Sequence, residues 1–256
     1  MPKLRNAPFA IALLLTACTS SQSPPQPQWT AVPVVAKPPA PLPVAHPMPL
    51  DLHWVRNSAE YRAAFLQTYA LATHRVEELA AGLPTGTWAV TLDGDETVWS
   101  NSEFQKEQGT RPFSDEAWDA WVARKQATAL PGAAAFLARV RELGGKIAIV
   151  TNRAQEECPA TEENMRLLDL AFDLLWCKPA DTSEKEPRWD AIVAGTTPAG
   201  LPPLQILLWV GDNINDFPNL DQRLRFEPAA AYRDFGTRFF LVPNPMYGSF
   251  VGNPRE

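Results

Sequence analysis

The sequence predicts an α/β fold in which helices cover both faces of a parallel sheet. Three observations support this prediction. Five short apolar segments each end in polar residues, stretches with helical spacing separate several of them, and a long amphipathic segment precedes them all. Strands that are apolar throughout and alternate with helices are typical of parallel sheets buried on both faces.

The chain begins with a targeting pattern that precedes this fold. Lys3 and Arg5 stand before an apolar run over residues 7–17, which is too short to span a bilayer and is typical of a secretory signal peptide. The run ends directly before Cys18 in a pattern that resembles the bacterial lipoprotein box, where the cysteine becomes the lipidated first residue. We therefore expect residues 1–17 to be a lipoprotein signal peptide. The alternative is an ordinary signal peptide that contains a cysteine.

Residues 18–50 are expected to tether the lipid on Cys18 to the folded domain. Ten of the 26 prolines lie between Pro24 and Pro49, among Ser, Gln, Ala and Val. A segment of this composition cannot bury a core and is expected to be extended. Thr19 follows the cysteine, and in Gram-negative lipoproteins the absence of Asp there implies sorting to the outer membrane. The expected location is the outer membrane, with the domain facing the periplasm or the surface.

Residues 51–256 are expected to form one domain. Its first element is a long amphipathic helix over Ser58–Leu83, with Ser58 as the N-cap. The expected strands then cover Trp88–Asp93, Lys146–Asn152, Phe172–Lys178, Ile206–Asp212 and Arg238–Asn244. The expected helices between them cover Pro131–Leu143, Thr161–Leu170 and Lys185–Ala194. The stretch from Val98 to Leu130 is short, so any cap over the sheet must be small.

Composition argues against several classes of function. The formal net charge is −6 and no run of Lys and Arg occurs, so a nucleic-acid polymer is not an expected partner. All three histidines, His46, His53 and His74, precede the expected strands. This argues against a Ser-His-Asp triad, a histidine-ligated zinc site and a phosphohistidine mechanism. Three cysteines are too few for a disulfide scaffold.

Polar side chains that could take part in catalysis or binding follow the expected strands. The carboxyl ends of parallel strands meet at one edge of the sheet, so these side chains are expected to lie close together. They are Asp93 and Asp95 at the first strand, Thr151 and Asn152 at the second, Lys178 and Lys185 after the third, and Asp212 and Asp216 at the fourth. Each of them alone would be a turn, a helix cap or a solvated residue. Together they suit phosphoryl transfer.

The chemistry of phosphoryl transfer explains this choice of residue types. A carboxylate can attack phosphorus to form an acyl-phosphate, and a second carboxyl group can protonate the leaving oxygen and then activate water. A hard cation such as Mg²⁺, held by oxygen ligands, cancels the repulsion between carboxylate and phosphate. A lysine and a threonine hydroxyl can hold the remaining phosphoryl oxygens.

These motifs resemble those of the haloacid dehalogenase (HAD) superfamily of phosphatases. The closer resemblance is to the class C acid phosphatases (subfamily IIIB), which include outer-membrane lipoprotein 5′-nucleotidases. The matching motifs are residues 93–97, residues 150–153, Lys185 within residues 182–185, and residues 211–217. The resemblance extends from Leu52 to Gly252. It implies a HAD-like Rossmannoid three-layer fold with a central parallel sheet, an N-terminal helix and only a small cap.

The resemblance also implies a role for each motif residue. Asp93 would be the nucleophile and a Mg²⁺ ligand, and Asp95 would be the general acid and base and would give its backbone carbonyl to the metal. Thr151 and Lys185 would bind the phosphoryl group with Asn152 as a helper, and Asp212 would be a metal ligand. Asp216 would either support the metal or orient Lys185. Lys178 is an alternative for the lysine role, although Lys185 is preferred because it opens an expected helix.

Four further features follow from the resemblance and the composition. Trp118 and Tyr247 are expected to sandwich a nucleotide base, with packing roles as the alternative for both. Gly94 stands where the branch usually has an aliphatic residue, and Trp99 where a smaller apolar residue is common. Cys158 and Cys177 flank one helix-to-strand unit, and an exported protein meets an oxidising compartment, so a disulfide is expected ahead of two free thiols.

The expected function is that of a secreted, lipid-anchored acid phosphatase with Mg²⁺ as cofactor. It would hydrolyse phosphate monoesters, with nucleoside 5′-monophosphates as the expected substrates, through an aspartyl-phosphate. The alternatives are a phosphotransferase that uses the same intermediate and a non-catalytic surface-binding lipoprotein. The expected partners are the substrate, the membrane through the lipid on Cys18 and, by resemblance, a second copy in a homodimer.

Overall fold

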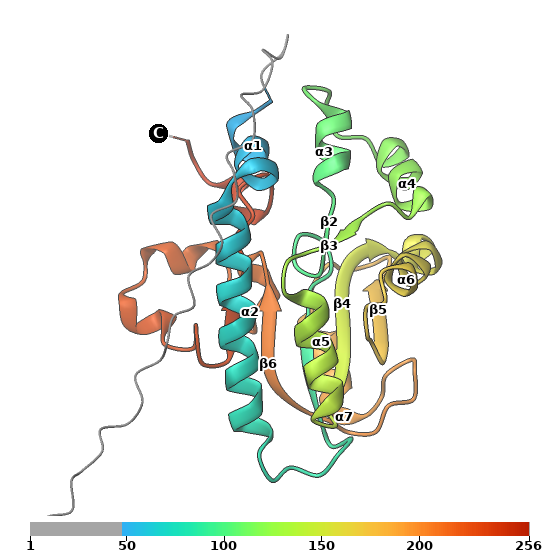
Figure 1. Ribbon diagram of the computed structural model, residues 1–256, viewed down its shortest axis with the longest axis vertical. Helices are drawn as coiled ribbons and strands as arrows, with labels where there is room; N and C mark the ends of the chain where they lie inside the picture. Colours follow the sequence, from blue (N-terminus) through green and yellow to red (C-terminus); the bar gives the residue numbers. More distant parts are fainter. Residues whose placement is uncertain (1–47, 256) are drawn as a thin grey trace, which may run out of the picture. The chain divides into compact units, whose positions relative to one another are not determined.

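A five-stranded parallel sheet organises the domain (Figure 1). The computed structural model describes residues 48–255, so the predicted signal peptide, Cys18 and the tether up to residue 47 lie outside the described range. The strand order is β5-β4-β1-β6-β7, and every neighbouring pair is parallel. The strands are β1 (Trp88–Leu92), β4 (Lys146–Ala154), β5 (Leu174–Lys178), β6 (Gln205–Gly211) and β7 (Phe239–Leu241). The predicted parallel α/β sheet is confirmed.

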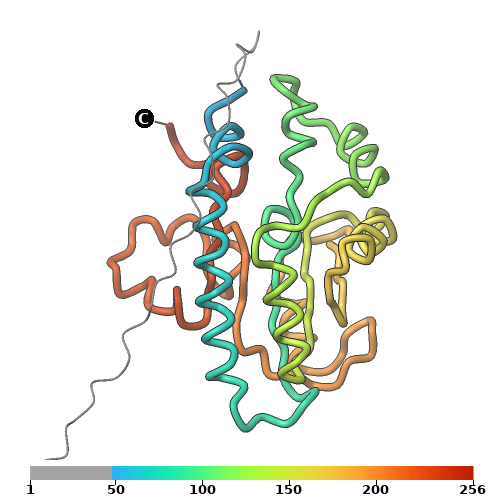
Figure 2. The backbone as a smooth tube through the Cα atoms, viewed as in Figure 1, coloured from blue at the N-terminus to red at the C-terminus, as the bar shows by residue number. Residues whose placement is uncertain are grey.

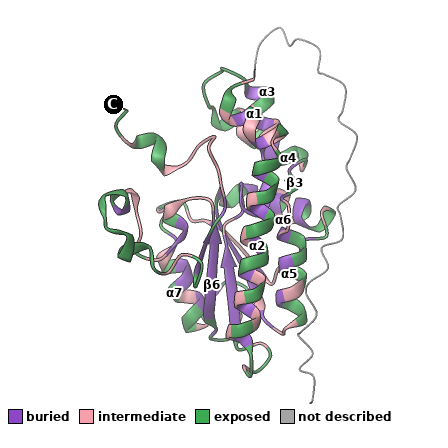
Figure 3. Cartoon of the chain, turned by 60° about the vertical axis from the view of Figure 1, so that its left-hand side comes forward, coloured by how far each residue is buried: buried purple, intermediate pink, exposed green. Residues whose placement is uncertain are grey.

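Alternating strand residues supply a hydrophobic core to each face of the sheet. Val90 and Leu92 of β1 belong to the core shared with α2 (Ala59–Ala80) and α5 (Ala133–Glu142). Ala89, which precedes Val90 and points to the other face, belongs to the core that α7 (Glu186–Ala194) covers. Figure 3 shows buried strands between helices whose outer surfaces are exposed. Because both faces are covered, the strands are apolar at nearly every position.

Helix boundaries follow capping residues more closely than the apolar pattern alone. Ser58 is the N-cap of α2, as predicted, and its Oγ accepts the Tyr61 N–H at 3.0 Å. A separate helix, α1 (Leu50–Asn57), precedes it and was not expected. The helix α6 (Cys158–Leu167) begins three residues before the predicted Thr161, because Pro159 is accommodated in its first turn.

A small cap covers the carboxyl edge of the sheet, as predicted. It consists of β2 (Trp99–Ser100), α3 (Ser102–Gln108), α4 (Asp115–Arg124) and β3 (Thr128–Ala129), and β2 pairs antiparallel with β3. Figure 2 shows this segment in green, above the ends of the strands. Three cap aromatics pack together: the ring centroid of Phe104 lies 5.2 Å from that of Trp118 and 6.1 Å from that of Trp121.

The remaining helical elements between residues 48 and 255 are short 3₁₀ turns in the loops and near the C-terminal end. They are η1 (Gln155–Glu157), η2 (Ile214–Asp216), η3 (Gln222–Phe226), η4 (Ala229–Tyr232) and η5 (Ser249–Gly252). Between residues 48 and 255, no helix is both long enough and apolar enough to cross a bilayer.

The strand order places a crevice at the end of β1. From β1 the chain continues to β4 and β5 on one side, and later to β6 and β7 on the other side. Ligands of doubly wound sheets bind where the strand order reverses in this way, beyond the carboxyl ends of the strands. Asp93 directly follows β1 at this point, and Asp212 directly follows β6.

Candidate active site

A cavity of about 540 Å³ opens at this edge of the sheet, and we call it the main cavity. It lies between the strand ends, the cap and the C-terminal segment. Its lining residues are Asp93, Asp95, Gln105, Phe113, Trp118, Asn152, Arg153, Lys185, Asp212, Asn213, Asn215, Asp216, Tyr247 and Gly248. Residues from all four predicted strand ends therefore meet in one place.

Asp93 contacts a buried lysine that is shared with a second carboxylate. Lys185 Nζ donates to Asp93 Oδ1, and it donates to Asp216 Oδ1 at 2.7 Å. Burial raises the pKa of Asp93 to about 7, helped by the nearby charges of Asp216 and Asp95 and opposed by that of Lys185. Burial disfavours the Lys185 ammonium, but the two carboxylates outweigh this effect and raise the pKa of Lys185. The lysine therefore stays charged next to Asp93.

Both carboxylate oxygens of Asp216 accept hydrogen bonds from the protein. Its Oδ1 accepts from Lys185, and its Oδ2 accepts the Asn213 N–H at 2.9 Å. Gly211, at the end of β6, makes room for it, because a Cβ at that position would come closer than 3.0 Å to the Asp216 side chain. Of the two roles that the resemblance implied for Asp216, this geometry favours the orientation of Lys185.

Asp212 is held by one hydrogen bond at each of its carboxylate oxygens. Thr97 Oγ1 donates to Oδ1 at 3.0 Å, and Asn244 Nδ2 donates to Oδ2 at 2.8 Å. Burial raises the pKa of Asp212 well above its ordinary value, and the charges of Asp216 and Asp93 raise it further. Both donors fix the orientation of a carboxylate that faces other carboxylates.

The donor set at this point fits a hard divalent cation. Asp93, Asp212 and Asp216 each offer one carboxylate oxygen, and these oxygens lie within 4.8 Å of one another. Lys185 pairs with Asp93 and Asp216 but not with Asp212. Burial, together with the neighbouring carboxylates, raises the pKa of Asp93 and of Asp212. Oxygen ligands with surplus negative charge are what Mg²⁺ and similar cations prefer.

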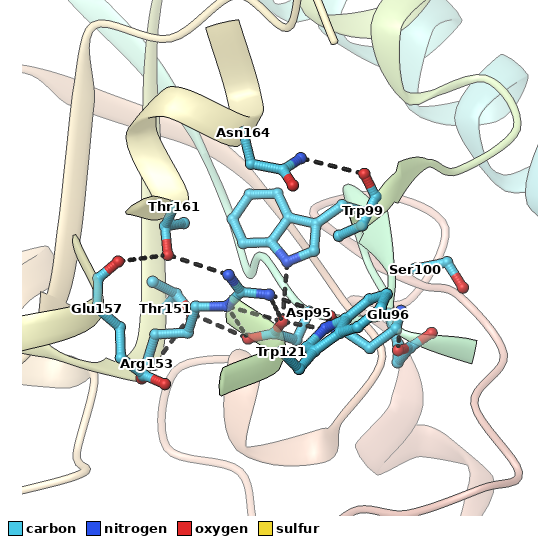
Figure 4. A network of polar contacts seen from close by, with 12 residues as sticks. Asp95, Glu96, Trp99, Ser100, Trp121, Thr151, Arg153, Glu157, Thr161 and Asn164 are labelled. Atoms are coloured by element: carbon cyan, nitrogen blue, oxygen red, sulfur yellow. Dashed lines mark hydrogen bonds and ion pairs between the residues drawn. The ribbon is translucent and has the colours of Figure 1, made fainter. Parts of the chain in front are cut away.

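Asp95 has a different partner, the buried side chain of Arg153 (Figure 4). Arg153 Nη2 donates to Asp95 Oδ1 at 2.7 Å, and Nε lies 3.0 Å and 3.1 Å from the two carboxylate oxygens. Trp99 Nε1 and Asn101 Nδ2 also donate to Oδ1, at 2.8 Å and 2.7 Å. Burial alone would raise the pKa of Asp95, but the charge of Arg153 and these hydrogen bonds lower it.

Further contacts hold Arg153 in place on both sides. Its Nη1 donates to Thr161 Oγ1 at 3.0 Å, and its Nη2 also donates to Asn101 Oδ1 at 3.1 Å. The guanidinium lies over the rings of two tryptophans, with its carbon 5.1 Å from the ring centroid of Trp99 and 5.3 Å from that of Trp118. Arg153 therefore connects the cap to Asp95.

The two departures from the family pattern, Gly94 and Trp99, explain one another. A Cβ built at Gly94 would lie closer than 3.0 Å to the ring of Trp99. The tryptophan occupies the space that an aliphatic side chain at position 94 would fill, and it gains a hydrogen bond to Asp95 that a smaller apolar residue lacks. The two positions therefore form one packing unit beside the site.

Thr151 lies deeper than its expected role requires. It is fully buried, its Oγ1 accepts the Arg153 N–H at 3.2 Å, and it lies 3.5 Å from Asp95 Oδ2. It does not line the main cavity, whereas the adjacent Asn152 does. Arg188 holds this strand end by donating to Asn152 Oδ1 at 2.6 Å and to the Thr151 carbonyl at 2.7 Å. Burial lowers the pKa of Arg188 to about 10.

The structure decides between the two candidate lysines. Lys185, the N-cap residue of α7, lines the main cavity and contacts Asp93. Lys178 ends β5 and is not among the residues that line the main cavity.

Aromatic side chains form the outer wall of the main cavity. Trp118 of α4 and Tyr247 of the C-terminal segment both line it, and Phe113 joins them. The Tyr247 hydroxyl donates to Glu96 Oε1 at 3.0 Å, which anchors the far end of its ring. Phe113 was not predicted, and the residue is 63% exposed.

Several residues that shape the site were not assigned a role from the sequence. They are Thr97, Asn101, Phe113, Arg153, Arg188 and Asn244. Arg153 stands within the second motif, so its position offered a signal, but an arginine after a strand is more often a solvated loop residue. Arg188 and Asn244 offered none, because each lies outside the motifs that carry the resemblance.

A disulfide joins Cys158 to Cys177, as expected, with the two Cα atoms 6.0 Å apart. It links the first residue of α6 to β5 beside the strand end that carries Asn152 and Arg153. The cross-link therefore lies close to the site without contributing a side chain to the main cavity.

Comparison with known proteins agrees with this geometry. The model of the HAD superfamily, subfamily IIIB (acid phosphatase), matches residues 40–250. The structure of the class C acid phosphatase from Bacillus anthracis is 26% identical with a TM-score of 0.70, and the alignment covers 79% of this chain and 86% of that one. The structure of the same enzyme with tungstate bound is 25% identical with a TM-score of 0.69 and the same coverage.

The family inferred from the motifs is confirmed by these matches, and so is the HAD-like fold. The acidic cluster of Asp93, Asp212 and Asp216 is consistent with the divalent metal that this superfamily generally uses. The chain belongs to subfamily IIIB of the HAD superfamily, and it is an acid phosphatase that hydrolyses phosphate monoesters.

Proposed function

We propose that this acid phosphatase is Mg²⁺-dependent and acts on nucleoside 5′-monophosphates through an aspartyl-phosphate on Asp93. The observation that carries the proposal is the placement of Asp93: its carboxylate lines the main cavity at the end of β1, next to the charged Lys185. In the proposed first step a carboxylate oxygen of Asp93 attacks phosphorus, and the bond from phosphorus to the ester oxygen breaks.

Asp95 has the position and partners of a general acid and base. In the first step its carboxyl proton passes to the leaving oxygen, and in the second step its carboxylate takes a proton from water as that water attacks phosphorus. The bond between phosphorus and Asp93 then breaks and releases inorganic phosphate. Arg153 lowers the pKa of Asp95 and so favours its ionised form, which is the form needed to take a proton from water in the second step. The protonated form needed in the first step is the minor one, and its share grows as the pH falls.

Mg²⁺ would be held by carboxylate oxygens of Asp93 and Asp212 and by the backbone carbonyl of Asp95. When bound, such a cation neutralises charge that develops on the phosphoryl oxygens. Thr97 and Asn244 fix the orientation of Asp212 for this purpose. Asp216 acts through Lys185, which balances the charge of Asp93 and can donate to a phosphoryl oxygen, while Asn152 is the nearest polar group at the second strand end.

A nucleotide base fits the aromatic wall of the main cavity. Trp118 and Tyr247 line the same cavity as Asp93, and aromatic faces stack on every base. The Bacillus anthracis relative has been solved with tungstate, a tetrahedral oxyanion like phosphate, which is consistent with an oxyanion site in this family.

The decisive experiment compares wild type with Asp93→Asn, using para-nitrophenyl phosphate with Mg²⁺. We expect turnover to fall by about a thousandfold or more, because the amide is a far weaker nucleophile than the carboxylate. EDTA should abolish wild-type turnover, and added Mg²⁺ should restore it. Near-wild-type turnover of Asp93→Asn would disprove the mechanism, and a nucleotide panel with a Trp118→Ala variant would test the substrate.

The proposed location is the outer membrane, with a lipid on Cys18. The support is the short apolar run that ends directly before this cysteine and the Pro-rich segment that follows it. Labelling with a radioactive fatty acid should mark the wild-type protein and leave Cys18→Ser unlabelled. Equal labelling of both proteins would refute the anchor. Chemical cross-linking of the full-length chain would test the predicted homodimer.

A further inference from the structure

A second cavity of about 750 Å³ adjoins the main cavity, and we call it the acidic cavity. It lies between α4 and the segment that leads from β4 into α6. It shares Phe113, Trp118 and Asn152 with the main cavity, so the two have a common wall. Its other lining residues are Asp115, Asp119, Val122, Ala123, Ala154, Glu156, Glu157, Ala160 and Lys178.

The acidic cavity carries an excess of negative charge. Four carboxylates, those of Asp115, Asp119, Glu156 and Glu157, face one lysine, Lys178. None of these five groups makes an ion pair with any residue in the range 48–255, although exposed carboxylates elsewhere in the domain do so repeatedly. The field in this cavity therefore attracts cations.

Glu157 supplies the observation that points to a ligand. The residue is only 8% exposed, and its Oε2 accepts the Ala154 N–H at 2.6 Å. Its Oε1 has no hydrogen-bond partner within the part of the chain that the structure describes. Burial raises the pKa of Glu157, the Ala154 N–H and the charge of Arg153 oppose this, and the charges of Asp95 and Asp119 add to it. A buried carboxylate oxygen without a donor is costly, and a cation or donor from outside the chain would relieve that cost.

An organic ammonium fits these walls better than a metal ion does. The carboxylates here do not converge as Asp93, Asp212 and Asp216 do, which form the one such acidic group among the described residues. The walls instead combine spread negative charge with apolar surface. The rings of Phe113 and Trp118 lie 6.3 Å apart at 42°, and the exposed face of Phe113 can receive a cation.

We propose that the acidic cavity binds an ammonium group carried by the leaving alcohol of a phosphomonoester whose phosphate is bound at Asp93. This inference rests on the proposed function, because it takes Asp93 as the point of hydrolysis. The two cavities share Phe113, Trp118 and Asn152 in their linings, so a phosphomonoester bound at Asp93 has the acidic cavity next to it. Amine-bearing phosphomonoesters would then be hydrolysed in preference to neutral analogues of the same length.

The test compares ω-aminoalkyl phosphates with n-alkyl phosphates over a series of about two to six methylene groups. The chain length of the best substrate then reports the distance between the phosphate site at Asp93 and the ammonium site in the acidic cavity. At the optimal length we expect kcat/KM to favour the amine by about fivefold or more, mainly through KM. The preference should weaken between about 0.05 M and 0.5 M salt, because exposed charges are screened.

Two variants locate the effect within the molecule. Asp119→Asn combined with Glu156→Gln should remove the preference and leave the turnover of para-nitrophenyl phosphate unchanged. The matched control, Glu60→Gln with Asp190→Asn, removes the same charge from exposed sites elsewhere and should keep the preference. A third variant, Glu157→Gln, should also reduce the preference.

The outcomes separate this inference from the proposed function. If wild type turns over para-nitrophenyl phosphate but prefers the amine at no chain length, the acidic cavity is not a substrate site and the proposed function still stands. A preference that survives in Asp119→Asn/Glu156→Gln would also overturn the inference. Failure of wild type on para-nitrophenyl phosphate would overturn the proposed function, and this inference with it.

Discussion

Replacing Arg153 by methionine should destabilise the domain and change the pH dependence of catalysis. Methionine keeps much of the apolar volume of the arginine stem but removes the guanidinium that holds Asp95. In the structure that guanidinium is 2.7 Å from Asp95 Oδ1, and the two side chains are 3% and 18% exposed. The substitution leaves a nearly buried carboxylate without its counter-ion.

The size of the effect follows from this burial. Removing one partner of a buried ion pair costs about 3–5 kcal/mol. Trp99 and Asn101 still donate to Asp95 in the variant, and the cavity admits water, so we expect the lower end, about 3 kcal/mol. For a domain of this size the melting temperature should fall by about 6–12 °C.

The pH dependence of the effect has a definite sign. Arg153 lowers the pKa of Asp95 in the folded state, so the pair stabilises the fold above the ordinary pKa of an aspartate, about 3.9. That stabilisation is lost as the pH falls through the lowered value. The difference in melting temperature between wild type and variant should therefore be full at neutral pH and shrink toward strongly acidic pH. In the variant, Asp95 stays buried but loses the charge of Arg153, so its pKa should rise. The part of the kcat–pH profile that depends on Asp95 should therefore move to higher pH.

Thermal unfolding and pH–rate profiles on para-nitrophenyl phosphate measure these quantities. The matched control is Arg166→Met in α6, because Arg166 is 66% exposed and pairs with Glu162 across one helical turn. That substitution should cost less than about 0.5 kcal/mol. An Arg153→Met variant that melts with wild type and keeps its pH profile would show that the ion pair contributes neither to stability nor to the protonation of Asp95.

Three further substitutions test other parts of the site. Replacing Cys158 and Cys177 together by serine should lower the free energy of unfolding by about 3 kcal/mol, because the disulfide closes a loop of 19 residues. Calorimetry with and without a reductant should show that only wild type responds to the reductant. Gly94→Val should lower the melting temperature by overlap with the Trp99 ring, and adding Trp99→Leu should recover part of the loss; equal melting of all three proteins would contradict the packing argument. Asp212→Asn should weaken Mg²⁺ binding about tenfold or more in titration calorimetry, and unchanged affinity would exclude Asp212 as a ligand.

The sheet and its site edge could be predicted because their physical basis is local in the sequence. Strands buried on both faces are apolar throughout, so β1, β4 and β6 could be recognised together with the polar residues that end them. The helix α1 and the cap helices could not, since α3 and α4 are short and pack against α1 and α6, which lie far from them in the sequence. Their stability depends on contacts between segments distant in sequence.

The second strand end shows why side-chain roles are harder to predict than positions. β4 continues to Ala154, two residues beyond the expected end, so Arg153 also lies inside the strand. Side chains alternate along a strand, so Thr151 is buried while Asn152 faces the main cavity. The importance of Arg153 depends on burial by Trp99 and Trp118 of the cap, which no pattern near residue 153 records.

The cap is built around Asp95, and this limits how it can serve catalysis. Trp99 donates to Asp95, the rings of Trp99 and Trp118 both pack against the Arg153 guanidinium, and Trp121 Nε1 donates to Asn101 Oδ1 at 2.8 Å. A large opening of the cap would have to break these contacts together with the ion pair. Substrate choice in this domain therefore depends on the walls of a preformed cavity. A group that stacks on Trp118 is separated only by that ring from the guanidinium of Arg153, which holds the carboxylate of Asp95.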